Sequence, residues 1–255
     1  MEMTSYRPGT PSWVDVGSPD PEASARFYAA LFGWEVEAAL PGSGGYSYLT
    51  LRGRRVAGLG PLARSGKPFW STYIATDDAE AVTRAVTASG GRVLMAPTQM
   101  MDIAKAAVFA DPAGAQFGVW EAGTLAGAGI VGEPGSLCFS ELATRAADGA
   151  IPFYQGVFGW TARKEQTGAR WLWELDGGRT VGGLVETDEQ SLPADAPARW
   201  SACFAVDDTD QAIVRVRESG GSVLDAPTDL PAGRTAVVAD PHGAVFSLIK
   251  PRTSA

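Results

Sequence analysis

The order of apolar and polar positions predicts a short strand, one helix and then further strands in the first quarter of the chain. Residues 13–16 alternate like a strand, and residues 18–20, Ser-Pro-Asp, favour the start of a helix. Residues 23–32 carry apolar side chains at helical spacing, and Gly33 is expected to end that helix. Residues 46–59, "YSYLTLRGRRVAGL", alternate around a central glycine and indicate a hairpin.

The same order of elements recurs because the chain contains an internal duplication. "FYAALFGW" at residues 27–34 returns as "FYQGVFGW" at residues 153–160, and later Trp-Ser, Asp-Asp, Ser-Gly-Gly and Ala-Pro-Thr recur in the same order. Repeats indicate repeated structural units. Four β-α-β-β-β modules are therefore predicted, over about residues 11–62, 68–121, 135–186 and 198–250. The octet is expected to end a helix and pack it, so it marks the duplication and not an active site.

The duplication predicts an N-terminal domain at residues 1–122, a linker at residues 123–134 and a C-terminal domain at residues 135–255. The linker is rich in Gly, Ala and Pro and is expected to run over the surface. The chain has 255 residues, 45% hydrophobic and 20% charged, which is ordinary for globular domains. We expect either a monomer, as a pseudo-dimer of its halves, or a homodimer.

Charge and hydropathy exclude some partners. The net charge is −8 and no basic patch is found, so no nucleic acid is expected to bind. No apolar run approaches the roughly 20 residues of a membrane span. The N-terminus lacks the basic-then-apolar pattern of a secretory signal. We therefore expect no membrane partner and a cytoplasmic location.

Cysteine and histidine are too few for several kinds of site. The two cysteines, Cys138 and Cys203, form no Cys-x-x-Cys motif, so neither a disulfide framework nor a thiolate metal site is expected. The single histidine, His242, cannot supply a two-histidine metal site. It lies in "ADPHGAVF", which reads as a solvated turn between strands. Cys203 has no histidine near it in sequence, so covalent catalysis is disfavoured even though His242 belongs to the same module.

Four such modules with "FYAALFGW", "DPAGAQFGVW" and "DPHGAVFSLI" resemble the vicinal oxygen chelate superfamily. That superfamily includes glyoxalase I, bleomycin-resistance proteins and extradiol dioxygenases. The resemblance covers nearly the whole chain and is greatest to fused two-half, glyoxalase-like or hydroxylase-named members common near actinobacterial antibiotic pathways. It implies an α+β fold in which paired modules curl into two half-barrels, each a cup for a small ligand. One fold hosts many activities, so the resemblance alone selects none.

The resemblance also implies where a metal site would lie. The usual first-strand ligand is histidine or glutamine, and the usual last-strand ligand is a glutamate seven residues after the Asp of Asp-Pro. The corresponding residues here are Trp13, Ser71, Phe139 and Ser201 on the first strands, and Gly118 and Ser247 on the last strands. None is a metal ligand of that kind. We therefore expect no metal and no cofactor, and the alternative is a divalent ion held by Asp15, Glu141 or Glu121.

Strand alternation predicts which side chains face the cups. The two valines of residues 13–16 are expected to face the helix, so Trp13 and Asp15 face the cup, and Phe139 and Glu141 take the same places in the second half. The other expected lining residues are Tyr46, Tyr48, Tyr73, Met100, Met101, Trp171, Trp173 and Cys203. Aromatic side chains around a carboxylate suit a flat aromatic or apolar ligand. If only one half binds ligand, the N-terminal half is favoured.

Two roles remain open for Asp15 and Glu141. Desolvation among aromatic rings would raise their pKa toward the range of an acid-base catalyst. Alternatively, they cap backbone donors or pair with an arginine at a module interface. The aromatic residues likewise either line a ligand site or pack the core.

We therefore predict a metal-independent, bleomycin-resistance-like protein that binds an aromatic or apolar small molecule in bacterial secondary metabolism or resistance. The alternative is a metal-independent enzyme (an isomerase, a cyclase or a hydroxylase-associated protein) acting on a polyketide-like substrate with Asp15 or Glu141 as acid or base. A third hypothesis, a glyoxalase or dioxygenase with an unusual metal site, is disfavoured by the missing ligands.

Overall fold

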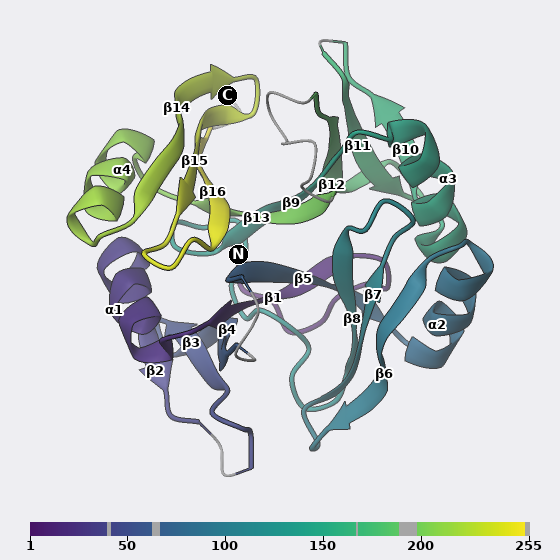
Figure 1. The fold of residues 1–255 in the computed structure, drawn as a ribbon, viewed down its shortest axis with the longest axis horizontal. Helices are drawn as coiled ribbons and strands as arrows, with labels where there is room; N and C mark the ends of the chain where they lie inside the picture. The colour runs from purple at the N-terminus through teal and green to yellow at the C-terminus, as the bar shows by residue number, and fades with distance from the viewer. Residues whose placement is uncertain (40–41, 63–66, 167, 189–197, 253–255) are drawn as a thin grey trace.

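The computed structural model describes residues 1–39, 42–62, 67–166, 168–188 and 198–252 (Figure 1). Within them, four β-α-β-β-β modules follow one another, which confirms the predicted α+β fold. The first module comprises β1 (Pro11–Ser18), α1 (Pro21–Phe32), β2 (Glu35–Glu37), β3 (Ser47–Leu51) and β4 (Arg54–Pro61). The second comprises β5 (Phe69–Thr76), α2 (Ala79–Ala88), β6 (Arg92–Met100), β7 (Ala104–Ala110) and β8 (Gln116–Ala122).

The second half of the chain repeats this order. The third module comprises β9 (Leu137–Thr144), α3 (Ala147–Phe158), β10 (Thr161–Lys164), β11 (Arg170–Leu175) and β12 (Arg179–Glu186). The fourth comprises β13 (Arg199–Ala205), α4 (Thr209–Glu218), β14 (Ser222–Leu230), β15 (Gly233–Ala239) and β16 (Val245–Pro251).

Short-range chemistry explains where helices begin and end. The Asp20 carboxylate accepts a hydrogen bond of 2.9 Å from the Ala23 N–H at the start of α1, which satisfies one of the free N–H groups of the first turn. Gly33 ends the helix in the left-handed region with φ of 72°. Asp78 caps α2 in the same way.

Each half of the chain forms one sheet of eight strands. The strand order is β2-β3-β4-β1-β5-β8-β7-β6 in the N-terminal sheet and β10-β11-β12-β9-β13-β16-β15-β14 in the C-terminal sheet. The first strands of consecutive modules pair antiparallel, β1 with β5 and β9 with β13. Consecutive modules therefore share a sheet, a pairing that the sequence alone left open.

The two halves share their hydrophobic cores. Helix α1 packs beside α4, and α2 packs beside α3 (Figure 1). One core joins Val14 and Phe27 of the first module to Phe204 and Phe246 of the fourth. A second core joins the second and third modules in the same way. The halves are therefore interlocked, because neither buries its helices and the convex face of its sheet by itself.

The repeated octet supplies part of this interlock. The Tyr28 hydroxyl in α1 donates a hydrogen bond of 3.1 Å to the Asp240 carboxylate in the turn before β16. The Trp70 indole N–H donates to the Tyr28 oxygen at 3.1 Å. Tyr154 of the second octet donates to Asp111 at 3.1 Å in the equivalent arrangement. Both tyrosines are fully buried, so the octet tyrosines join one half to the other and line no ligand cup.

The linker at residues 123–134 differs from the predicted surface connection. Ala128 and Ile130 are buried. The Ala128 N–H donates to the Ser12 carbonyl at 2.7 Å, and the Gly129 N–H donates to the Arg55 carbonyl at 2.7 Å. Residues 123, 124, 132 and 134 are exposed as predicted, and the prediction was wrong only for the middle of the segment, whose small side chains let the backbone pack against the N-terminal sheet. Among the described residues, no helix is both long and apolar enough to cross a bilayer.

Candidate ligand-binding cup

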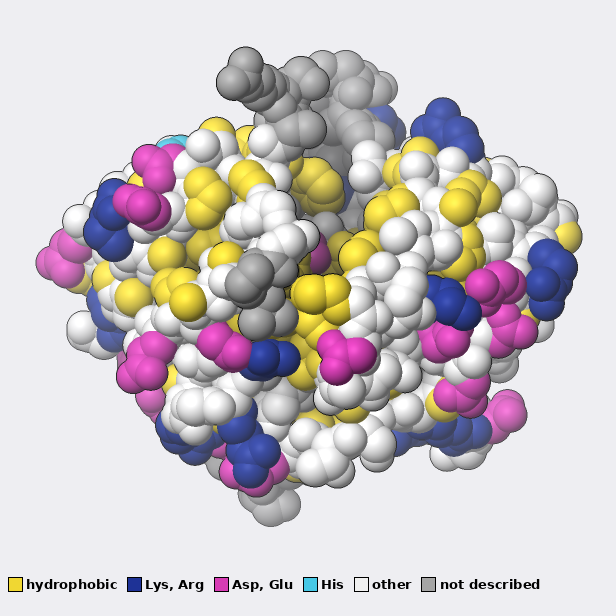
Figure 2. All heavy atoms as spheres, turned by 90° about the horizontal axis from the view of Figure 1, so that it is seen from below, with side chains coloured by type: hydrophobic (Ala, Val, Ile, Leu, Met, Phe, Trp, Pro, Cys, Tyr) yellow, Lys and Arg dark blue, Asp and Glu magenta, His cyan; other side chains and the backbone are white. Residues whose placement is uncertain are grey.

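The concave face of the N-terminal sheet carries a cluster of aromatic side chains. Trp13 points there from β1, whereas the neighbouring Val14 packs with the helices on the other face. The Trp13 ring stacks on Trp120 with centroids 5.8 Å apart and meets Tyr48 edge-on at 6.0 Å. In Figure 2, hydrophobic side chains surround a hollow in the middle of this face of the molecule. The N-terminal cup, as we call it, consists of Trp13, Asp15, Tyr46, Tyr48, Tyr73 and Trp120.

Glycines opposite the aromatic rings make room for them. A Cβ on Gly58 would lie 1.7 Å from the Tyr46 hydroxyl oxygen, and a Cβ on Gly118 would lie 2.2 Å from the Tyr73 ring. Both distances are far shorter than any real contact, so only glycine is compatible with these ring positions. The strands beneath Tyr46 and Tyr73 are thus shaped to the rings.

Asp15 is the acidic group of the N-terminal cup. The Tyr46 hydroxyl donates to the Asp15 carboxylate at 3.2 Å and accepts from the Trp13 indole N–H at 3.1 Å. Burial raises the pKa of Asp15, and hydrogen bonds from Ser71, Tyr73 and Tyr46 oppose that rise. Burial and the Asp15 charge hold the pKa of Tyr46 and Tyr73 well above their usual range, so both hydroxyls remain donors.

The C-terminal sheet carries different chemistry at the equivalent positions. Glu141 forms an ion pair with Arg170, whose guanidinium also lies 3.7 Å from Glu165. Burial raises the pKa of Glu141, and the charge of Arg170 opposes the rise. Pairing with an arginine was one of the two alternative roles that the sequence suggested for Glu141. The C-terminal cup, with Phe139, Glu141, Arg170 and Cys203, therefore holds its carboxylate in an ion pair.

Cys203 faces the C-terminal cup from β13, opposite Phe139 in register. The Cys138 thiol donates to the Cys203 carbonyl at 3.2 Å. A hydrogen bond with Cys138, together with burial, raises the pKa of the Cys203 thiol well above its usual range. A protonated thiol is a poor nucleophile. His242 lies in the predicted turn between β15 and β16, but its Nε2 is buried and has no partner among the described residues.

Three predicted lining residues lie elsewhere. Trp171 and Trp173 pack with the core between the second and third modules, on the face opposite the C-terminal cup, and Trp173 is fully buried. Leu172 pairs with Gly183, which itself pairs with Glu141, so Leu172 and not its neighbours faces the cup. A shift of one residue moves every side chain to the other face. Met101 is half exposed in the turn after β6, whereas Met100 packs against the N-terminal cup.

Trp120 and Arg170 were not identified from the sequence. Trp120 lies two residues after Gly118, a position already counted as facing the cup, so strand parity could have found it. Arg170 begins β11, and its position depended on the strand register. Charge alone did not identify it, because 21 lysine and arginine residues are spread along the chain.

The residues present do not fit a metal site. Asp15 is surrounded by aromatic rings and hydroxyl groups, and Glu141 is held by a guanidinium. Among the described residues, no group of three or more His, Cys, Asp and Glu side chains could hold an ion. A protein site for a divalent cation needs several such donors. We therefore assign no chemical step to a metal.

Comparison with known proteins agrees with this architecture. Residues 13–120 match a family model described as a glyoxalase-like domain. Residues 138–248 match the model of the glyoxalase/bleomycin resistance protein/dioxygenase superfamily. The Mn(II)-bound glyoxalase from Novosphingobium aromaticivorans is similar in structure, with a TM-score of 0.68, 17% identity, and coverage of 96% of this chain and 82% of that one. At this identity the likeness shows the fold alone.

Two similar proteins match over almost their whole length. The anthracycline biosynthesis protein DnrV from Streptomyces peucetius is 39% identical, over 98% of this chain and 96% of that protein. CFP32 from Mycobacterium tuberculosis is 39% identical, over 98% of both chains. With two matching domains and full-length relatives, the chain belongs to the glyoxalase/bleomycin resistance protein/dioxygenase superfamily.

Proposed function

We propose that this protein binds a flat aromatic small molecule in the N-terminal cup without using a metal. The observation that carries the proposal is the set of mutually contacting aromatic rings that converge on one carboxylate. Trp13 and Trp120 form a buried floor, and Tyr46 and Tyr73 remain partly accessible above it. Aromatic surfaces with a few fixed polar groups are typical of small-molecule sites.

The relatives favour the same class of ligand. DnrV carries a name that connects it with anthracycline biosynthesis. Anthracyclines contain fused polycyclic rings, which offer the faces and edges that stacked and edge-on aromatic contacts recognise. Asp15 and the tyrosine hydroxyls would orient a phenol or quinone oxygen at one edge of such a ring system.

Titration with 1,8-dihydroxyanthraquinone tests the proposal. We expect saturable quenching of tryptophan fluorescence, with a dissociation constant in the micromolar range, about −8 kcal/mol. Tyr73→Ala removes a partly accessible ring and should weaken binding by about tenfold. Phe139→Ala in the C-terminal cup is the matched control and should leave the affinity unchanged. The proposal would be refuted if the anthraquinone showed no saturable binding, or if Phe139→Ala weakened binding and Tyr73→Ala did not.

A second function, acid-base catalysis, is favoured by one further observation. Asp15 has a raised pKa beside the hydroxyls of Tyr46 and Tyr73. In such a site the carboxylate would take a proton from an acidic carbon, and a tyrosine would donate to the enolate oxygen that forms. The ion-paired Glu141 suits this role less, because Arg170 stabilises its charged form.

Hydrogen–deuterium exchange distinguishes a catalyst from a carrier. Benzoylacetone carries an acidic C–H between two carbonyl groups beside an aromatic ring. A catalyst should accelerate exchange at that carbon, and Asp15→Asn should abolish the acceleration while binding is retained. A carrier should bind benzoylacetone without changing its exchange rate from the rate measured in buffer alone.

A further inference from the structure

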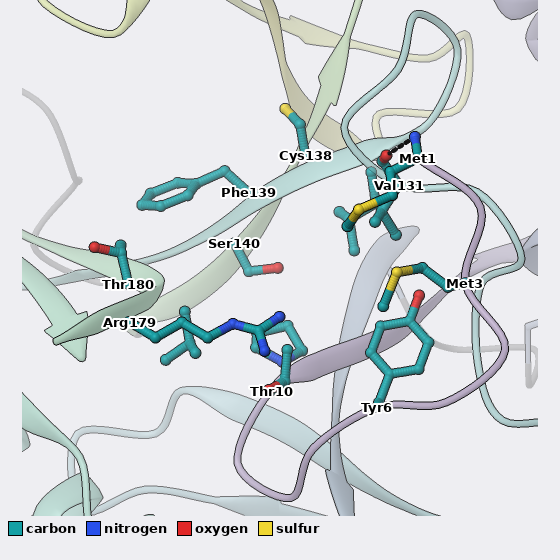
Figure 3. A pocket seen from close by; sticks show the side chains of 13 residues that line it. Met1, Met3, Tyr6, Thr10, Val131, Cys138, Phe139, Ser140, Arg179 and Thr180 are labelled. Atoms are coloured by element: carbon teal, nitrogen blue, oxygen red, sulfur yellow. Dashed lines mark hydrogen bonds between the residues drawn. The ribbon is translucent and has the colours of Figure 1, made fainter. Parts of the chain in front are cut away.

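A second cavity, lined in part by Phe139 of the C-terminal cup, lies between the two halves (Figure 3). Its volume is about 340 Å³. The wall on one side comes from the N-terminal segment and the start of β1, and the wall on the other side comes from β9 and β12. This volume lies at the lower end of the roughly 300–1,000 Å³ typical of small-molecule sites. The cavity therefore suits a compact ligand.

The wall built by the N-terminal segment is held in place. The Met3 N–H donates to the Gly129 carbonyl at 3.0 Å, and the Val131 N–H donates to the Met1 carbonyl at 3.0 Å. The Tyr6 hydroxyl donates to the Ala128 carbonyl at 2.6 Å. These bonds join the segment to the packed linker, so the cavity is preformed.

Two buried hydroxyls at the cavity lack partners. Thr10 Oγ1 and Ser140 Oγ are buried and form no hydrogen bond among the described residues. Ser140 is 1% exposed, and its hydroxyl points toward the middle of the cavity in Figure 3. A buried polar group without a partner costs about 1–3 kcal/mol. Such a hydroxyl needs a partner, which either an ordered water or a bound ligand supplies.

Arg179 adds a positive charge to the same cavity. Its guanidinium extends into the cavity in Figure 3. It forms no ion pair with any residue that the structure describes, whereas Arg163 and Arg170 in the same module do. Arg179 is exposed and lines the cavity with both hydroxyls, and a guanidinium can bind a carboxylate through two hydrogen bonds. The remaining wall is largely apolar, with Met1, Met3, Pro11, Val131, Leu137 and Val181.

From these contacts we infer that the cavity is a binding site for a small monocarboxylate with an apolar body. Arg179 pairs with the carboxylate, and the Ser140 and Thr10 hydroxyls donate to its oxygens. The apolar wall covers the rest of the molecule. The site is separate from the proposed ligand site in the N-terminal cup, so each can fail without the other.

Methionine methyl resonances can test the two sites in one spectrum. The chain has five methionines. Met1 and Met3 line the cavity, whereas Met95 and Met100 pack against the N-terminal cup. In protein labelled with ¹³C at the methionine methyls, titration with benzoate or hexanoate should shift the Met1 and Met3 signals to saturation. The Met95 and Met100 signals should stay in place.

Variants assign the binding to the proposed groups. Arg179→Gln should weaken benzoate binding by about tenfold or more, and Arg179→Lys should recover part of it. Ser140→Ala should weaken it by a few fold. Arg84→Gln, on an exposed helix position, is the matched control and should change nothing. Benzamide, of similar shape but uncharged, should bind at least tenfold more weakly than benzoate.

Three results would overturn the inference. The first is the absence of saturable Met1 and Met3 shifts at benzoate and hexanoate concentrations well above about 1 mM, the weak end of specific binding. The second is equal affinity for benzoate and benzamide. The third is benzoate binding that Arg179→Gln leaves unchanged, which would mean that Arg179 does not hold the carboxylate.

Discussion

At the residue scale, the two halves use the same strand position for different chemistry. Asp15 receives hydrogen bonds from neutral hydroxyls, whereas the equivalent Glu141 is neutralised by Arg170. Tyr46 and Arg170 each supply the partner of the carboxylate in their own half. Both halves therefore carry an acidic side chain at this position, but its partners differ. No cationic group is among those that shift the pKa of Asp15.

The raised pKa of Asp15 predicts a pH dependence of stability. The folded state binds the Asp15 proton more tightly than the unfolded state does, so this group stabilises the fold at low pH. That contribution is lost as the pH rises from the ordinary pKa of an aspartate, about 4, through the raised pKa of Asp15 in the folded protein. Asp15→Asn lacks this loss. Urea unfolding between pH 4 and 7 should show wild type losing stability relative to Asp15→Asn as the pH rises.

The control for this measurement is Asp20→Asn, which changes an exposed carboxylate at a helix cap. Because Asp20 is exposed, this variant makes the same aspartate-to-asparagine change outside the N-terminal cup. A constant difference between wild type and Asp15→Asn across the range would contradict the prediction.

At the element scale, strand glycines determine the shape of the N-terminal cup. Gly58 of β4 lies beneath the Tyr46 ring, and Gly118 of β8 lies beneath Tyr73. Strand β4 pairs with β1, which contains Trp13, and strand β8 pairs with β5, which contains Tyr73. A glycine in a strand normally weakens it, so its presence here indicates close approach of a side chain.

Gly58→Ala should therefore displace Tyr46 from Asp15. The added Cβ would lie 1.7 Å from the Tyr46 hydroxyl oxygen, so the ring must move. We expect a loss of about 1–3 kcal/mol in the free energy of unfolding, and loss of the anthraquinone affinity proposed above. Gly149→Ala in α3, where nothing lies within 4 Å of the new Cβ, is the matched control. It should leave the affinity unchanged and raise stability by up to about 1 kcal/mol.

Differential scanning calorimetry and the anthraquinone titration together check this prediction. A Gly58→Ala protein as stable as wild type, with unchanged affinity, would show that Tyr46 does not occupy the position described. Reduced stability with full affinity would show that Tyr46 packs the core and does not contact the ligand.

At the scale of the whole molecule, the halves fold on each other. The two hydrophobic cores beneath the helices each take residues from both halves. Tyr28 bonds to Asp240 and Tyr154 bonds to Asp111, each across the boundary between halves. A chain divided at residues 123–134 would therefore expose the helices and the convex faces of both sheets.

One cooperative unfolding transition is the expected consequence. Tyr28→Phe and Tyr154→Phe each remove one donor from a buried carboxylate and should cost about 1–3 kcal/mol. Because the cores are shared, each change should lower the midpoint of one common transition. Near-ultraviolet circular dichroism during urea unfolding measures this. Two separate transitions, with each variant moving only one of them, would contradict the shared cores.

Much of the fold and part of the site followed from local pattern. Asp20 begins α1 through a short-range hydrogen bond, and Gly33 ends it through its left-handed backbone. The repeated octets at residues 27–34 and 153–160 indicated the duplication. Parity predicted that Trp13 and Tyr73 share a face of the sheet, and the two residues are directly opposite each other in β1 and β5. It failed at Trp171 and Trp173 because the face that β11 turns to the cup depends on its register with β12, which places Leu172 opposite Gly183.

The sequence by itself determined the four modules, the helix limits and the kinds of side chain that could meet in a cup, because these depend on neighbours within a few residues. Only the tertiary structure decided which modules share a sheet, which partner each buried carboxylate has, and that the linker packs against the N-terminal sheet. It also brought Thr10, Ser140 and Arg179 to one cavity. Such pairings join residues far apart in the chain, and their energies depend on packing and burial that no local pattern encodes.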